Sequence, residues 1–175
     1  MTCDLSIIIP VIHEAAAINP LLESIHRERF SAKIEIIVVD GDPSGSTLCH
    51  VSDRSVTGIV SAPGRGKQMN AGAETASGRI LLFLHCDTRL PENGLAMILE
   101  AMAGDALAAG AFDLKIDHPG LLFRLIEKSA SIRSRLTRIP YGDQAIFIRR
   151  SFFDRIRGYR PIPIMEDVDL MQRVK

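Results

Sequence analysis

The chain of 175 residues has the length of a single domain built around one hydrophobic core. Its 21 Lys and Arg residues balance its 21 Asp and Glu residues, so the net charge gives no reason to expect nucleic-acid binding. Three cysteines without a C-x-x-C pair argue against a disulfide framework and against a zinc site bound by sulfur. No apolar run approaches the length of a membrane span, and the first residues are unlike a signal peptide, so we expect a cytoplasmic protein.

Short apolar segments rich in β-branched residues alternate with longer amphipathic segments. The predicted strands are residues 5–12, 34–40, 57–62, 80–87, 108–116 and 144–150. The predicted helices are residues 14–28, 46–54, 66–77, 92–103 and 119–137, with one more helical pattern near the C-terminus. A strand that is apolar throughout must be covered on both faces. The sequence therefore predicts one α/β domain over residues 1–175, with a mainly parallel sheet between two helix layers.

Acidic residues follow three of the predicted strands. Glu14 follows the first strand, Asp40 and Asp42 the second, and Asp87 the fourth. Ligands of open α/β sheets bind where the strands end, so these carboxylates would gather at one edge. They would repel one another unless a cation lay among them, and Mg²⁺ commonly takes one or two carboxylates plus substrate phosphates. A solvated turn after the fourth strand explains Asp87 equally well.

The glycine-rich stretch PGRGKQMNAGA, residues 63–73, offers the opposite charge. Arg65 and Lys67 lie between glycines just before a predicted helix, an arrangement suited to phosphate. The stretch matches neither a Walker loop nor a G-x-G-x-x-G fingerprint. A glycine-rich turn with solvated basic residues is the alternative interpretation.

An acidic cluster opens the last helical pattern, IMEDVDLMQRV. Glu166, Asp167 and Asp169 in a first helical turn are explained by favourable interaction with the helix dipole. Together with the acids after the strands, they also offer a second carboxylate pair that could act as a general base.

Six motifs in this order resemble those of the family 2 glycosyltransferases of the GT-A fold. They are SIIIPVIHE, IIVVDGDPSGST, GRGKQMNAGA, ILLFLHCDTRLP, YGDQAIFIRR and MEDVDL. Within that family the chain looks like the short bacterial members described as selenium- and radical-SAM-associated transferases. The resemblance spans nearly the whole chain and implies a Rossmann-like three-layer sandwich that binds a nucleotide sugar.

The resemblance also implies roles for individual residues. The expected nucleotide-sugar contacts come from Pro10, Glu14, Asp40, Arg65, Lys67, Asn70 and Gln144. Asp87 matches the last Asp of the D-x-D motif, which binds Mg²⁺ or Mn²⁺ and the diphosphate, whereas His85 replaces the first Asp. Asp167 matches the presumed base of the E-D motif, with Glu166 beside it.

The implied function is transfer of a sugar from a nucleotide diphosphate sugar, expected to be UDP-linked, to a hydroxyl acceptor with inversion. A nucleotidyltransferase is the less favoured alternative. Such an enzyme would carry its glycine-rich loop directly after the first strand, where this chain has VIHEAAA. A non-catalytic binding or scaffold protein derived from a transferase stays open, because His85 departs from the D-x-D pattern.

Two further expectations concern surfaces. Residues 119–137 combine an apolar stripe with basic residues, which predicts either an ordinary core-facing helix or a surface for anionic lipid or a lipid-linked acceptor. Similar transferases continue beyond the E-D motif, so the chain looks truncated or naturally minimal. We therefore expect the segment from about Pro161 to be mobile or ordered by a second subunit, with Leu170 and Val174 incompletely covered.

Overall fold

The computed structural model describes residues 3–28, 31–114, 131, 132, 137, 139, 140 and 142–174. Its strands are β1 (Leu5–Val11), β2 (Ile34–Asp40), β3 (Thr57–Val60), β4 (Ile80–Phe83), β5 (Ala109–Gly110) and β6 (Ile146–Arg149). Its helices are α1 (Ala15–Arg27), α2 (Arg65–Thr75), α3 (Gly94–Ala101), α5 (Arg150–Arg155) and α6 (Glu166–Val174). Two 3₁₀ helices, η1 (Leu48–His50) and η2 (Gly142–Gln144), lie in connections.

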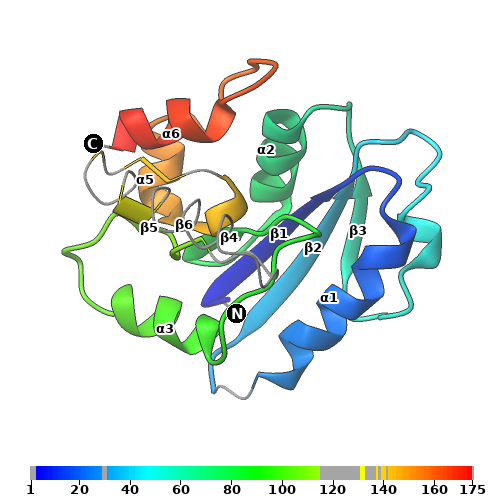
Figure 1. Ribbon diagram of the computed structural model, residues 1–175, viewed down its shortest axis with the longest axis horizontal. Helices are drawn as coiled ribbons and strands as arrows, with labels where there is room; N and C mark the ends of the chain where they lie inside the picture. Colours follow the sequence, from blue (N-terminus) through cyan, green and yellow to red (C-terminus); the bar gives the residue numbers. More distant parts are fainter. Residues whose placement is uncertain are drawn as a thin grey trace.

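The six strands form one sheet in the order β3-β2-β1-β4-β6-β5 (Figure 1). Strands β1 to β4 are parallel, whereas β6 runs antiparallel to both β4 and β5. The parallel strands end at a common edge, and the loops that follow them lie together there. We call this the carboxyl edge of the sheet and its opposite the amino edge.

Each face of the sheet is covered by helices. Helices α1 and α3 pack on one face, and α2, α5 and α6 pack on the other. A hydrophobic core lies on each face of the sheet, and β1 contributes to both. Ile7 and Ile9 pack in the core beneath α1 and α3, and Ile8 packs in the core beneath α2, α5 and α6. Helix α2 lies very close to β1, because a Cβ at Gly72 would stand 2.4 Å from Ile8 Cγ2. The predicted mainly parallel sheet between two helix layers is confirmed.

Several predicted element boundaries were wrong. Only Leu48–His50 of the predicted helix 46–54 is helical, as η1, because the Asp40 side chain binds the amides of Thr47 and Leu48. The predicted strand 108–116 contracts to β5. The segment predicted as strand 144–150 continues without a turn into α5, a helix that the sequence pattern did not indicate.

The expectation that Leu170 would be incompletely covered was also wrong, whereas mobility of the C-terminal segment stays a prediction. Helix α6 is formed, and Leu170 is completely buried in the core with Met171 nearly so. Arg173 donates to the carbonyls of Ile156 and Gly158, which fastens the helix to the preceding turn. Most of the predicted helix 119–137 lies outside the described residues. Among the residues that are described, no helix is long and apolar enough to cross a bilayer.

Candidate functional site

The carboxyl edge collects side chains from five connections. Glu14 precedes α1, the 41–47 loop follows β2, Arg65 begins α2, and Asp87 lies just beyond β4. Helix α6 brings Glu166 and Asp167 to the same place, since the charge of Arg65 acts on both Glu14 and Asp167. The structure thus brings together most of the residues that the sequence singled out.

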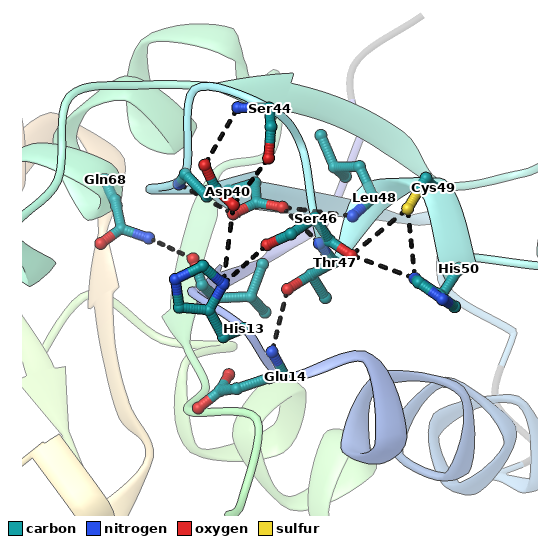
Figure 2. A network of polar contacts seen from close by, with 12 residues as sticks. His13, Glu14, Asp40, Ser44, Ser46, Thr47, Leu48, Cys49, His50 and Gln68 are labelled. Atoms are coloured by element: carbon teal, nitrogen blue, oxygen red, sulfur yellow. Dashed lines mark hydrogen bonds and ion pairs between the residues drawn. The ribbon is translucent and has the colours of Figure 1, made fainter.

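Asp40 organises the loop that follows β2 (Figure 2). Its Oδ2 accepts hydrogen bonds from the amides of Thr47 (2.8 Å) and Leu48 (3.2 Å), and its Oδ1 accepts one from the amide of Asp42 (2.9 Å). The Thr47 hydroxyl in turn accepts from the Glu14 amide at 3.0 Å, which ties this loop to the start of α1. Asp40 is completely buried, so its observed role is to shape the loop. Contact with a nucleotide base stays a prediction.

Gln68 is a residue of this edge that the sequence analysis missed. Gln68 is a residue of α2, and its Nε2 donates to the carbonyls of Val11 (2.8 Å) and Val39 (2.9 Å). These two residues lie at the carboxyl ends of β1 and β2. It is 3% exposed, and a Cβ at Gly41 would stand 3.0 Å from its amide group. Gln68 therefore locks α2 to two strand ends. No local sequence signal identifies such a link, because its partners are backbone atoms.

The N-terminus of α2 presents the basic residues. Arg65 and Lys67 are exposed, and Gly64 precedes them with a φ of 125° that favours glycine. A Cβ at Gly66 would lie 3.2 Å from the Arg160 carbonyl and 3.7 Å from Glu166 Cβ, so glycine permits α2 to approach α6 closely. The exposed amides of a helix N-terminus and two cations make this corner suitable for phosphate.

Asn70 has a structural role that the sequence did not indicate. Its Nδ2 donates to the Tyr159 carbonyl at 2.8 Å, and its Oδ1 accepts from the Tyr159 amide at 2.9 Å. Both ends of the side-chain amide are thus engaged by the backbone of one residue 89 positions away. Asn70 joins α2 to the segment that leads into α6, and its contact with a nucleotide stays a prediction.

The segment after β4 contains one exposed and two enclosed polar side chains. Asp87 is exposed, whereas His85 Nε2 is buried and has no hydrogen-bond partner among the described residues. Burial, and then the charge of Arg65, lower the pKa of His85, so its imidazole is neutral at pH 7. Cys86 lies against Glu14, and burial with the nearby carboxylate raises the pKa of Cys86 to about 12. The thiol therefore stays protonated, donates a hydrogen bond to Glu14 and is not a nucleophile.

Asp167 has the environment of a general base. Only 8% of it is exposed, and burial followed by the charge of Glu166 raises its pKa to about 6. The Tyr159 hydroxyl and Arg65 act in the opposite direction and lower this pKa. Asp167 Oδ1 and the Tyr159 hydroxyl are both buried, and neither makes a hydrogen bond of normal geometry within the described residues. Perturbed carboxylates of this kind are common at catalytic sites.

Pro10 and Gln144 are both buried, although the resemblance implies that they contact the nucleotide sugar. Pro10 is a buried residue of β1. Gln144 is 3% exposed, and its side-chain Nε2 donates to the Phe112 carbonyl at 2.9 Å. The backbone carbonyl of Gln144 accepts a hydrogen bond from the Phe112 amide. Their roles in sugar binding stay predictions. Glu14 is partly buried, with a pKa that burial raises.

The capacity for a metal ion is limited to a few donors. Within the described part of the chain no group of three His, Cys, Asp or Glu side chains could hold a metal ion. Asp87 offers an exposed carboxylate, and His85 offers a buried imidazole nitrogen that has no hydrogen-bond partner in the described part of the chain. One carboxylate is sufficient for a cation whose other ligands are water and phosphate oxygens. These residues therefore fit a cation shared with a diphosphate, and not a cation held by protein alone.

Comparison with known proteins decides the family. The sequence profile described as "Glycosyl transferase family 2" matches residues 6–162. The chain belongs to glycosyl transferase family 2. No curated protein matches the sequence significantly.

Solved structures show the same fold. The Staphylococcus aureus TarS fragment 1–349 in complex with UDP-GlcNAc superposes with a TM-score of 0.73 at 18% identity, covering 97% of this chain and 52% of that one. The mannosyltransferase PcManGT from Pyrobaculum calidifontis, in complex with GDP-Man and Mn²⁺, gives 0.66 at 20% identity, covering 91% and 48%. The expected GT-A fold is thereby confirmed. This chain spans about half the length of these two structures.

Proposed function

We propose that this family member binds a nucleotide diphosphate sugar at the carboxyl edge and transfers the sugar, with inversion, to a hydroxyl acceptor. The observation that carries the proposal is the position of Asp167. A buried carboxylate with a pKa of about 6 stands beside Glu166 and within electrostatic reach of Arg65. The charge of Arg65 acts on Asp167, which supports a base and a phosphate-binding corner within one site.

The donor side is formed by α2. Arg65 and Lys67 would bind the diphosphate, and the N-terminal amides of the helix add favourable partial charges. Asp40 holds the loop after β2 in place, so that loop offers a fixed wall to the nucleoside. The complexes of TarS with UDP-GlcNAc and of PcManGT with GDP-Man support a nucleotide-sugar donor of this class. We propose a UDP sugar, as the sequence motifs imply.

The chemistry is a direct displacement. Asp167 accepts the proton of the acceptor hydroxyl as the hydroxyl oxygen forms its bond to the anomeric carbon. The bond from that carbon to the diphosphate breaks on the opposite face, and the leaving diphosphate keeps the electron pair. Attack and departure on opposite faces invert the anomeric carbon, by the geometry that applies to inverting glycosidases. Arg65 and Lys67 offset the charge that the leaving diphosphate develops.

A divalent cation, Mg²⁺ or Mn²⁺, would be held by Asp87 and would stabilise the diphosphate charge as a Lewis acid. The neutral imidazole of His85 is a second donor on the same segment. Glu166 stays beside the base, where its charge helps to keep the pKa of Asp167 raised.

The test separates binding from chemistry. Donor affinity is measured by calorimetry with UDP-GlcNAc and GDP-Man, with Mn²⁺ or in excess chelator, and release of free sugar is followed as donor hydrolysis. Asp167→Asn should lower hydrolysis by about 10²- to 10⁴-fold, the usual contribution of a general base, with donor affinity retained. Asp154→Asn, an exposed position on α5, is the matched control.

Asp87→Asn tests the cation. It should remove most of the dependence of donor affinity on Mn²⁺, and equal affinity in chelator for both proteins would refute the metal assignment. Donor binding without any turnover in the parent would favour the non-catalytic alternative. Hydrolysis unchanged in Asp167→Asn would remove the base assignment.

A further inference from the structure

The segment that leads into α6 exposes an apolar cluster. Ile162 is 37% exposed, Ile164 74% and Met165 55%. Ile162 lies between Pro161 and Pro163, and Ile164 and Met165 follow Pro163. Figure 1 shows this segment as the loop that projects beyond the helices between α5 and α6. Single exposed apolar residues are ordinary, but three within four positions form a patch that suggests a partner. We call residues 161–165 the apolar loop.

The apolar loop is anchored at both ends. On one side, Asn70 holds the backbone of Tyr159. On the other side, Met165 has a φ of 64° and its carbonyl accepts from the Asp169 amide at 3.0 Å in the first turn of α6. Two prolines restrict the backbone between these anchors. The side chains are therefore displayed outward by a constrained turn, while Leu170 and Met171 of the same region are buried.

Exposed basic side chains precede the apolar loop along the chain. Arg155, Arg157 and Arg160 precede it and are exposed, and Lys67 of α2 is next to Gly66, which packs against the Arg160 carbonyl. Arg160 is partly neutralised by Asp169 at 3.0 Å, and Asp154 is an exposed acid in the same stretch. Glu166 and Asp167, which follow the loop, are buried, so the exposed side chains of this stretch carry more positive than negative charge although the whole chain has a net charge of zero.

We propose that the apolar loop docks on an anionic lipid bilayer. Its isoleucine and methionine side chains would insert at the interface, and the exposed basic side chains named above would contact the headgroups. Apolar tips beside cations match the two components of interfacial binding, apolar burial and attraction to anionic lipid. Glu166 and Asp167 follow the loop directly. Docking would therefore place the opening of the site at the lipid surface, within reach of an acceptor hydroxyl carried there. The docking itself does not depend on the proposed sugar transfer.

Sedimentation with vesicles tests the docking. The whole chain should bind vesicles of phosphatidylcholine with 30% phosphatidylglycerol and bind phosphatidylcholine alone at least tenfold more weakly. The double variant Ile164→Ser with Met165→Ser should bind the anionic vesicles at least tenfold more weakly than the parent. Met97→Ser is the matched control, because Met97 is 49% exposed on α3, at a separate part of the surface.

Charge is tested separately. Arg157→Glu should weaken binding to anionic vesicles about three- to tenfold and reduce its salt dependence, whereas Arg54→Glu, at an exposed position after η1, should not. The docking proposal is overturned if anionic vesicles do not bind the parent, or if the double variant binds as the parent does. It is also overturned if light scattering shows that the loop variant abolishes self-association instead, since the loop would then be a subunit interface. Donor affinity measured in the same variants is expected to be unchanged, so a failure of docking is distinguishable from a failure of the proposed function.

Discussion

The two edges of the sheet treat their carboxylates in opposite ways. At the amino edge, Glu35 of β2 accepts hydrogen bonds from the Ser6 hydroxyl, from the amide and hydroxyl of Ser77, and from the Gly78 amide. Partial burial raises its pKa, but these hydrogen bonds together outweigh burial and lower it. At the carboxyl edge, Asp167 is more deeply buried, lies beside a second carboxylate, and has a pKa raised to about 6.

The difference separates a structural charge from a reactive one. Every donor around Glu35 favours its ionised form, so this charge stabilises the fold by joining β1, β2 and the turn before β4. Burial and the neighbouring acid disfavour the ionised form of Asp167, so this charge opposes folding and is ready to accept a proton. Proteins commonly tolerate such local cost where function requires it. Arg150, whose Nη2 is buried and has no partner among the residues that the structure describes, shows that the amino edge also contains an unsatisfied group.

The largest effect is expected at Glu35. Glu35→Ala leaves the donors of Ser6, Ser77 and Gly78 without their acceptor, and should lower the free energy of unfolding by about 2 kcal/mol at pH 7. Because the pKa of Glu35 is lowered in the folded state, this stabilisation is present above the ordinary value of 4.5 and is lost as the pH falls below it. Urea denaturation at several pH values measures this loss of stability. Glu100→Ala, at an exposed position of α3, is the control. A loss below about 0.5 kcal/mol would mean that water replaces the network.

The opposite sign is expected at Asp167. Its pKa rises from 3.8 in the unfolded chain to about 6 in the folded one, so the folded state binds its proton more tightly and stability falls as the pH rises between these values. Asp167→Asn should therefore raise the free energy of unfolding by about 1–2 kcal/mol at pH 8 and leave it unchanged near pH 3. The same urea series measures this, with Asp154→Asn as the control. Destabilisation at pH 8 would contradict the view that the charge opposes folding.

The smallest effect is expected at Tyr159. Its hydroxyl favours the ionised form of Asp167, so Tyr159→Phe should raise the pKa of Asp167 further and move the acid limb of the pH–rate profile upward by about half a unit to one unit. Donor hydrolysis across pH 5 to 8 measures the shift. The maximal rate and the donor affinity should change little, which distinguishes this positioning role from a structural one. An unchanged acid limb would show that the hydroxyl does not act on the base.

The sequence predicted the sheet well because its information is local. Apolar runs such as residues 34–39 indicate buried strands, and acids directly after strands fall at one edge in any parallel sheet. Glu14, Asp40 and Asp87 were therefore placed together correctly. Glu166 and Asp167 follow no predicted strand, and the sequence indicated them only as a separate carboxylate pair. Helix α5 was missed because the apolar pattern of β6 runs into it without a turn residue.

The partners of individual side chains could not be predicted in the same way. Asn70 was expected at the nucleotide, yet its amide is bound to the backbone of Tyr159, which lies far along the chain. Asp40 was expected at a base, yet its oxygens are bound by amides of its own loop. Backbone donors and acceptors are present at every residue, so a sequence contains no mark of which ones a side chain will reach.

The two hydrogen bonds between the Asn70 side chain and the Tyr159 backbone provide a way to observe motion within the site. The Tyr159 amide is bound to α2, which carries the phosphate-binding cations, while its chain continues to the base in α6. Its exchange with deuterium requires the hydrogen bond to Asn70 to open, and separation of the donor side from the acceptor side opens it. One backbone amide, observed by nuclear magnetic resonance, would record how often the two halves of the site come apart and whether a bound nucleotide sugar holds them together.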